Sequence, residues 1–537
     1  MSTAKLTDFS LLYPSGEKMR AHMEPGGRPR IDSFALEELG INEILELRNS
    51  ELCDYLSSDP EVLRYRLETF ADMLANPSLA RLLNKLLPIL WDILELRRLE
   101  SDSGDTNDYL LSISEIELYI SSIEVLYKGL SEIRQSLKSR AFTTLADTIS
   151  ELSQSEYHTE LNARLSELTQ RVREIKSVTI GVNLDTQLRP TSAGVLSINP
   201  EAFRSGDVIE KILRLSFKDD EYPCIAELVP FSKKQSENQK TALSLAFNSA
   251  INDVYKSSLR SWKRIVQSYV LDNTEFLLNL LPEIEFVVKA TELLRRLHSK
   301  GCTLSTPLIC PMKDRVFKAT SLYNPCVALK IDDEIIDNDL IFDENASIYV
   351  LTGPNRGGKS VITCALGIAQ IMFQLGLYVP CKRLEISPVD ALFTHFPTGA
   401  EDTIDKGRLG EECARLEEIF GLISPSSLVL LDESLSSTGS YEASYIAAEV
   451  LSGLAQVGCR CLFSTHLHEL AAEIDGINAR SRESGGVMID TLVAGIEEGK
   501  RSFRIVRAKP DGKSYARDIA EKYGLTYDKI IEKIKKN

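Results

Sequence analysis

The chain has 537 residues, which at ordinary domain sizes predicts roughly three or four domains. Apolar residues make up 43% of the sequence and charged residues 26%, which excludes a wholly disordered or fibrous protein. The sequence has no uncharged apolar run of about 18 residues, so we expect no membrane-spanning helix. It also has no signal-peptide core at its start, and its ten cysteines lack paired spacing. These features predict a soluble, reduced, cytoplasmic protein.

The net charge of −16 argues against a uniformly basic, nucleic-acid-binding surface. It leaves room for a local basic stripe, which is all that nucleic-acid binding needs. The six histidines have no metal-ligand spacing, which argues against a structural zinc site. Composition therefore says nothing about the chemistry of the protein.

The first half of the chain has the spacing of helices. Asp59 followed by Pro60 is a helix-start signal, and apolar residues spaced by threes and fours follow it. A longer stripe of the same spacing runs from Ile113 to Leu137, with few helix breakers between about Asp108 and Val178. We therefore expect long, paired helices that can act as lever arms.

At Val178 the spacing changes to the alternation of a strand, and prolines and glycines follow. The whole pattern predicts a multidomain fold: a long-helix core with a small β-containing insert, followed by an α/β domain. The predicted segments, in order, are an N-terminal segment at 1–44, a helical core and lever at 45–177, the insert at 178–235, a returning helical lever at 236–300, a loose linker at 301–330 and the α/β domain at 331–537.

Residues 353–360 match the phosphate-loop pattern G-x-x-x-x-G-K-[ST], between an expected strand and an expected helix. Glycines let backbone N–H groups curl around phosphates, and the helix directs its positive end at them. Lys359 is expected to reach the β and γ phosphates of ATP, and the Ser360 hydroxyl to reach Mg²⁺. The nucleotide-contacting residues predicted here are Gly353, Pro354, Asn355, Arg356, Gly357, Gly358, Lys359, Ser360 and Val361.

Two further apolar strands end in polar residues. The first ends in Asp432, a predicted Mg²⁺ ligand, and Glu433, a candidate general base for the attacking water. The second ends near His466, which either senses the γ-phosphate or is an ordinary polar residue at a strand end. In a parallel sheet these strand ends and the phosphate loop share one edge.

Four segments together resemble the ATPase domain of the MutS family of DNA mismatch-recognition proteins: TGPNRGGKS, SLVLLDE, FSTHLHEL and KPDGKSYARDIAEKYGL. SSDPEVLRYRLETFADML resembles the start of the family's helical core, so the resemblance covers most of residues 45–537. It implies a P-loop ATPase domain of the ABC type behind a clamp-like insert. It also implies that Asn338 lies near the nucleotide and that Ile335 packs on the adenine.

The resemblance further implies an ATPase with ATP and Mg²⁺ as cofactors, which closes as a dimer on mismatched, branched or distorted double-stranded DNA. In a bacterium such a protein would be associated with the nucleoid, with a repair protein as a possible partner. At the end of the insert and just beyond it, Lys233, Lys234 and Lys240 either contact DNA phosphates or form a solvated face.

The sequence departs from the family pattern at several positions. Arg356 stands in place of a methionine, and Val361 in place of a threonine. The family's Ser-Thr-Phe segment, which presents a serine to the partner's γ-phosphate, is replaced by GRLGEE at 407–412. Arg408 there either reaches the partner's γ-phosphate as an arginine finger or pairs with a neighbouring glutamate. The family's mismatch-reading N-terminal domain has no counterpart in this sequence.

Two other functions fit parts of the pattern. The nucleotide-binding subunit of a membrane transporter shares the phosphate loop, the Asp-Glu pair and the histidine, but this chain lacks the Leu-Ser-Gly-Gly-Gln signature. A nucleotide-gated scaffold without turnover has no need of a general base, and Glu433 argues against it.

Overall fold

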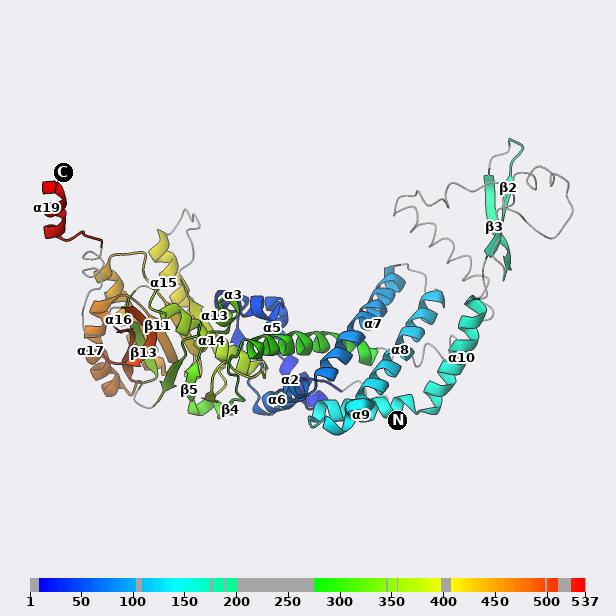
Figure 1. The fold of residues 1–537 in the computed structure, drawn as a ribbon, viewed down its shortest axis with the longest axis horizontal. Helices are drawn as coiled ribbons and strands as arrows, with labels where there is room; N and C mark the ends of the chain where they lie inside the picture. The colour runs from blue at the N-terminus through cyan, green and yellow to red at the C-terminus, as the bar shows by residue number, and fades with distance from the viewer. Residues whose placement is uncertain are drawn as a thin grey trace. The chain divides into compact units, whose positions relative to one another are not determined.

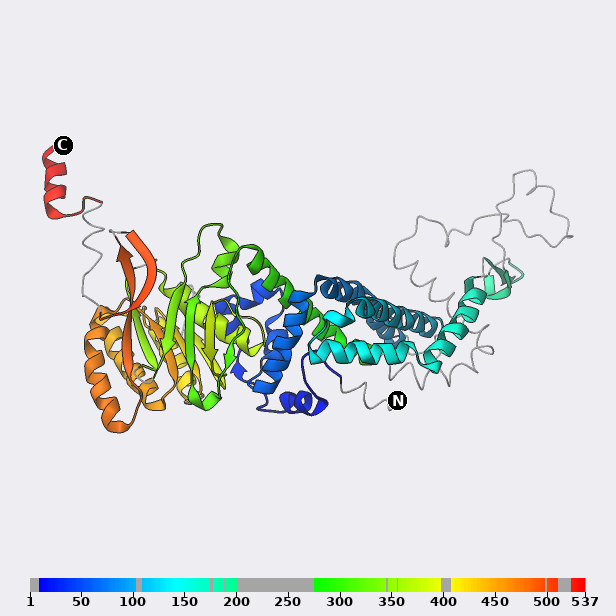
Figure 2. The same ribbon diagram turned by 60° about the horizontal axis from the view of Figure 1, so that its bottom comes forward.

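The structure is a computed structural model that describes residues 9–102, 109–173, 177–187, 190–199, 275–343, 346–354, 356–396, 407–497, 500–509 and 523–536. The chain forms two compact units, whose elements are drawn in Figures 1 and 2. Unit 1 comprises Met1–Phe9, Asn76–Leu137 and Phe142–Glu285, and unit 2 comprises Ser10–Ala75, Lys138–Ala141 and Phe286–Asn537. In the part of the chain that is described, no helix is long and apolar enough to cross a membrane.

Unit 1 is built on two long helices, α7 (Pro77–Asp102) and α8 (Tyr109–Ile133), which pack side by side (Figure 1). A Cβ on Gly129 of α8 would lie 2.5 Å from the Leu82 side chain of α7, so the glycine permits a close approach there. At the other end of the pair, Arg97 Nε donates to Glu115 Oε1 over 2.8 Å. These two contacts show that α7 and α8 are antiparallel, as the prediction of long paired helices requires.

The predicted long helical stretch is interrupted. Helix α8 ends at Ile133, and a short turn of 3₁₀ helix, Arg134–Ser136, follows it. The next helices are α9 (Arg140–Ser153) and α10 (Glu156–Arg173). The backbone amides of Lys138 and Ser139 donate to the Asp72 carboxylate, with distances of 3.0 and 2.7 Å to Oδ2, instead of continuing a helix. The apolar spacing to Leu137 therefore extends beyond the helix itself, and a side chain distant in sequence binds the amides that follow it.

The strand expected at Val178 is present as β2 (Ser177–Leu184), which pairs antiparallel with β3 (Pro190–Asn199). The rest of the predicted insert lies outside the described residues, and so do Lys233, Lys234 and Lys240. Of the returning lever, residues 275–299 are described, and they are helical.

Unit 2 contains a sheet in the order β1-β9-β10-β11-β7-β12-β13. Its strands are β1 (Arg30–Ile31), β7 (Ile348–Thr352), β9 (Ala391–His395), β10 (Leu428–Asp432), β11 (Arg460–Ser464), β12 (Ile489–Glu497) and β13 (Lys500–Arg507). All neighbours are parallel except β12 and β13, whose hairpin is orange in Figure 2. The central strands are buried along their whole length, as expected of apolar parallel strands. The predicted strands of the phosphate loop, of Asp432 and of His466 are adjacent, so their carboxyl ends meet at one edge.

Helices cover both faces of this sheet. Figure 1 shows α16 (Ser440–Val457) and α17 (His468–Ser484) on one side, where their apolar side chains form a core with the strands. On the other side lie α14 (Lys359–Gln374) and α3 (Ser33–Leu39). Gly367 of α14 leaves no room for a side chain, because a Cβ there would lie 2.7 Å from both Leu39 and Leu430. Two further helices of unit 2 are α15 (Gly407–Phe420) and α19 (Tyr527–Lys536).

A second sheet of unit 2 has the order β4-β8-β5-β6. Its strands are β4 (Leu308–Ile309), β5 (Phe317–Leu322), β6 (Asn338–Phe342) and β8 (Arg383–Ile386), and α13 (Pro325–Lys330) follows β5. Asn324 caps α13, since its Oδ1 accepts from the amide of Cys326 at 2.9 Å. Much of 301–330, for which the sequence suggested a loose linker, is therefore regular structure within unit 2.

Residues Ser10–Ala75 also belong to unit 2. They form α2 (Gly16–Met23), α3, α4 (Ile41–Leu45), α5 (Asn49–Tyr55) and α6 (Pro60–Ala75), while β1 extends the main sheet beside β9. Helix α6 begins at the predicted residue, and Asp59 Oδ1 accepts from the amide of Glu61 at 2.8 Å. The predicted N-terminal segment is thus integrated with the α/β part.

The carboxyl end of α14 is anchored by buried polar side chains. Gln374 Nε2 donates to Val389 O at 3.0 Å, and its Oε1 accepts from Val389 N at 3.3 Å. Fully buried Arg66 of α6 donates through Nε to Leu12 O at 3.1 Å. Its side chain packs against Gly376, where a Cβ would lie 2.5 Å from Arg66 Cβ. The end of α14 and the start of the helical core are therefore packed as one piece.

We predict that Gly376→Ala lowers the thermal midpoint of the protein more than Gly301→Ala does. The two glycines have φ values of +77° and +76°, so both substitutions carry the same cost of about 1–2 kcal/mol for a left-handed L residue. Only at Gly376 must Arg66 also shift, since nothing lies within 4 Å of a Cβ at Gly301. Circular dichroism during thermal denaturation gives the midpoint of each variant. Equal midpoints for the two variants would contradict the packing argument.

Candidate functional site

The loop between β7 and α14 has the backbone of a tight, glycine-dependent turn. Gly353 and Gly358 have φ values of +142° and +93°, which side chains disfavour. A Cβ on Gly353 would also lie 2.7 Å from Ala494 Cβ. Arg356 is exposed, with a φ of 61°, and Asn355 lies outside the described residues. The loop therefore places backbone groups and the amino end of α14 around a small concavity.

Lys359, the first residue of α14, folds back over this loop. Its Nζ donates to Gly353 O at 3.2 Å and to Pro354 O at 3.4 Å. Burial lowers the pKa of Lys359, while the charges of Glu433 and Asp432 act in the opposite direction. A buried ammonium whose hydrogen bonds, among the described residues, go to loop carbonyls can exchange these for phosphate oxygens.

Asp432 ends β10 beside Ser360. Burial raises the pKa of Asp432, whereas hydrogen bonds from the hydroxyls of Ser360 and Ser464 and the charge of Lys359 lower it. Its Oδ1 is buried and has no hydrogen-bond partner among the described residues. A carboxylate with a spare oxygen beside a serine hydroxyl is a suitable donor set for Mg²⁺, which prefers oxygen ligands. The residues present therefore fit the ion predicted from the sequence.

Glu433 follows directly and lines the same cavity as Lys359 and Ser360. Its φ of 49° is left-handed, and its amide donates to Ser464 O at 2.8 Å. Strained backbone of this kind concentrates at functional sites. The structure thus brings together the lysine, the serine and both carboxylates that the sequence predicted.

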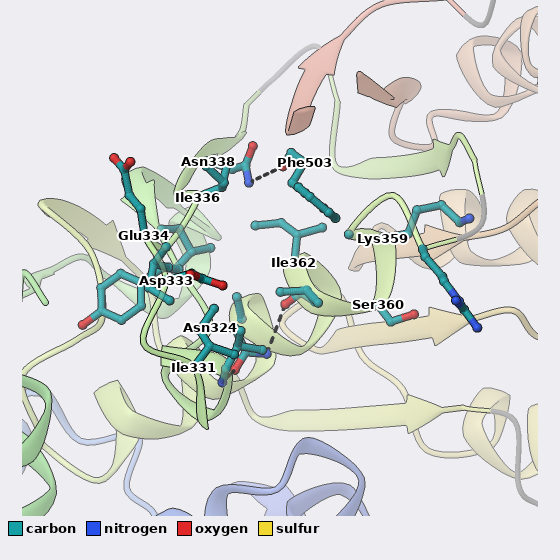
Figure 3. Close-up of a pocket in the computed structure, with 18 of the residues that line it drawn as sticks. Asn324, Ile331, Asp333, Glu334, Ile336, Asn338, Lys359, Ser360, Ile362 and Phe503 are labelled. Atoms are coloured by element: carbon teal, nitrogen blue, oxygen red, sulfur yellow. Dashed lines mark hydrogen bonds between the residues drawn. The ribbon is translucent and has the colours of Figure 1, made fainter. Parts of the chain in front are cut away.

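The cavity has a volume of about 580 Å³, and Figure 3 shows Lys359 and Ser360 at one end and Asp333 and Glu334 at the other. Between them the wall is largely apolar. The predicted residues Ile335, Asn338, Arg356, Gly358 and Val361 also line it, together with Ile331, Ile336, Ile362 and Phe503. A planar aromatic base fits the apolar part, and phosphates fit the end near Lys359.

Phe503 of β13 is a lining residue that the sequence reasoning missed. It is 45% exposed and has a φ of 55°, and its ring lies beside Gly358. The alternating segment KRSFRIVR predicts a strand, but nothing local shows that this strand reaches the phosphate loop.

Both ends of the Asn338 amide are used to hold Phe503 in place. Asn338 Nδ2 donates to Phe503 O at 3.2 Å (Figure 3), and Asn338 Oδ1 accepts from Ile505 N at 2.7 Å. Asn338 therefore joins β6 of the second sheet to β13 of the main sheet.

Several predicted residues are not among those that line the cavity. Gly353, Pro354 and Gly357 belong to the loop beside it, and Asp432 lies behind Ser360. His466 is exposed at the carboxyl end of β11. Arg408 lies in the first turn of α15, and its side chain is outside the described residues. One turn further along, the Glu412 carboxylate accepts a hydrogen bond from the amide of Leu435.

Comparison with known proteins gives two matches to family models. Residues 58–300 match the MutS2 N-terminal domain, and residues 349–535 match MutS domain V. The first match includes the helical stretch of both units, and the second includes the phosphate loop, Asp432, Glu433 and His466.

Curated relatives agree with these matches. The DNA mismatch repair protein MutS of Prochlorococcus marinus (strain MIT 9301) is 30% identical over 237 residues, which are 43% of this chain and 25% of that protein. MSH7 of Arabidopsis thaliana is 32% identical over 242 residues, 38% of this chain and 22% of the relative. Msh6 of Gallus gallus is 37% identical over 164 residues, 28% of this chain and 12% of the relative.

The matched part of this chain thus spans a quarter or less of the length of these relatives. The two family models nevertheless match successive segments between residues 58 and 535, and the second includes Lys359, Ser360 and Glu433 of the cavity. The chain therefore belongs to the MutS family.

Proposed function

We propose that this protein is a MutS-type ATPase that hydrolyses ATP to ADP and phosphate and couples this reaction to closure on double-stranded DNA. The observation that carries the proposal is the convergence of Lys359, Ser360 and Glu433 at a cavity of about 580 Å³ whose remaining wall is largely apolar, with Asp432 beside Ser360. Membership of the family and its DNA mismatch repair relatives support the coupling to DNA.

In this proposal each residue has a defined part. Lys359 exchanges its two loop carbonyls for the β and γ phosphates, and the amides of the loop bind the phosphate oxygens. Ser360 and Asp432 hold Mg²⁺, which when bound neutralises charge on the phosphate oxygens. Glu433 accepts a proton from the water whose oxygen bonds to the γ-phosphorus as the bond to ADP breaks.

The adenine binds in the apolar part of the cavity, between Ile335 and Phe503. Asn338 acts there by holding β13, since its amide is engaged with the backbone of Phe503 and Ile505. We place His466 near the γ-phosphate of a closed state, as the family resemblance implies. Glu433, as a candidate general base, favours an enzyme that hydrolyses ATP over a scaffold that only binds it.

For DNA we propose that two copies close as a homodimer around mismatched, branched or otherwise distorted double strands. Lys233, Lys234 and Lys240 contact DNA phosphates in this proposal, which makes that part of the binding independent of sequence and sensitive to salt. Arg408 reaches the partner's γ-phosphate, where a guanidinium stabilises the charge of the transition state.

Lys359→Ala should weaken ATP binding roughly tenfold to hundredfold, because a hydrogen bond to a charged group contributes about 1.5–3 kcal/mol. Equilibrium binding of a fluorescent ATP analogue measures the change. Lys313→Ala is the matched control, since this exposed lysine lies outside the cavity. Parental affinity in the Lys359 variant would contradict the assignment of the phosphate loop.

DNA should stimulate ATP hydrolysis, and a mismatched duplex or a four-way junction should stimulate it more than a perfectly paired duplex. The measurement is steady-state phosphate release with each DNA at equal nucleotide concentration. Glu433→Gln should slow the release roughly 10²-fold or more, because it removes the proposed base. If none of the three DNAs changes the rate of phosphate release while Glu433→Gln remains slow, the protein is an ATPase and the coupling to DNA is refuted.

Arg408→Ala should bind ATP normally but lose ATP-dependent dimerisation and turnover, because in this proposal Arg408 contacts the ATP bound by the partner. Mixing it with Lys359→Ala protein should restore part of the activity, since one of the two composite sites in the mixed dimer keeps both residues. Arg480→Ala, an exposed arginine on α17, is the matched control. Size-exclusion chromatography in the presence of ATP measures dimerisation, and phosphate release measures turnover. Turnover of Arg408→Ala alone at the parental rate would rule the idea out.

A further inference from the structure

The turn that follows β10 holds an unusual backbone. Glu433 and Leu435 have φ values of 49° and 66°, a left-handed conformation that residues with a Cβ disfavour. Such a turn persists only where surrounding structure holds it. The residue whose side chain needs the most exact placement, the proposed base Glu433, is part of this turn.

Three successive residues of the turn are bonded to three different elements. The amide of Glu433 donates to Ser464 O of β11 at 2.8 Å. The Ser434 hydroxyl bonds to His395, the last residue of β9. The amide of Leu435 donates to the Glu412 carboxylate of α15. Removing any one of these bonds frees a residue of the turn to relax.

Ser434 and His395 form a closed, buried pair, with 4% and 3% of their surfaces exposed. Ser434 Oγ donates to the carbonyl oxygen of His395 at 2.9 Å. His395 Nδ1 lies 2.7 Å from the same Oγ, within hydrogen-bond distance. Burial, with the nearby charge of Arg415, lowers the pKa of His395 to about 4, so the ring is neutral at pH 7.

The Glu412 carboxylate provides a second hydrogen bond that holds the turn. It lies on α15, and it accepts from the amide of Leu435, the second left-handed residue. A carboxylate bonded to a backbone amide makes a strong, charge-assisted hydrogen bond. The turn is therefore held between a strand end and a helix.

We propose that His395, Ser434 and Glu412 are positioning residues that fix the backbone of Glu433, so that its carboxylate faces the attacking water. This inference rests on the proposed ATPase function, and it gives a role to His395 and Ser434, which no sequence motif includes, and to Glu412 of the GRLGEE segment. None of the three is among the residues that line the cavity, so they act only through Glu433. Their loss should therefore lower kcat without weakening ATP binding.

The test uses the full chain with Ser434→Ala, Glu412→Ala, Glu412→Gln and Glu433→Gln. Phosphate release at varied ATP gives kcat and KM, and thermal denaturation checks folding. Ser434→Ala and Glu412→Ala should lose at least tenfold in kcat, with KM within twofold of the parent. Glu412→Gln should recover most of the rate, because its amide oxygen still accepts from Leu435. Glu417→Ala, exposed on the same helix, is the matched control and should behave as the parent.

The outcomes separate this inference from the proposed function. If Glu433→Gln hydrolyses ATP at the parental rate, Glu433 is not the base and the proposed mechanism fails. If Glu433→Gln is slow while Ser434→Ala and Glu412→Ala keep the parental kcat, the mechanism stands and the positioning role is overturned. The positioning role is also overturned if Glu412→Gln is as slow as Glu412→Ala. It is likewise overturned if the variants raise KM and lower the thermal midpoint together.

Discussion

The close packing of α14 in unit 2 is the constraint on which the nucleotide site depends. Every residue of this helix from Ala365 to Gln374 is buried. Gly367 lets it approach Leu39 on one side and Leu430 on the other, although a glycine inside a helix costs about 1 kcal/mol relative to alanine. Gln374 then fixes the far end to Val389. A helix held along its length presents Lys359 and Ser360 at a fixed distance from the carboxylates of β10.

The cavity is assembled from two sheets with separate tasks. The main sheet supplies the phosphate end, because β7, β10 and β11 are adjacent and parallel and their polar ends converge. The second sheet and the segment before β6 supply the apolar end with Ile335 and its neighbours. Asn338 joins the two sheets through β13. In the proposed function, binding of the base therefore depends on a contact between sheets, whereas binding of the phosphates depends on one sheet and one helix.

The sequence alone predicts the parts of this site that are local. The phosphate loop, Asp432 and Glu433 are short motifs next to apolar strands, and the parallel arrangement of those strands follows from their burial. The role of Phe503 and the anchoring of Glu433 by His395 and Glu412 depend on pairings between distant segments, which no spacing encodes. The same reason applies to the segment between α8 and α9, where the distant Asp72 carboxylate accepts from the amides of Lys138 and Ser139. Strand β1 has only two residues, too few for a visible alternation.

The contact between Gly376 and Arg66 also has a consequence for how related sequences can vary. Arg66 is fully buried, and its side chain occupies the space into which any Cβ at 376 would point. The nearest atom, however, is the Cβ of residue 66, which every residue except glycine carries, so that replacing Arg66 alone would not make room at 376. The glycine is therefore expected to persist in any lineage in which the start of the helical core packs on the end of α14, even where the arginine itself has changed.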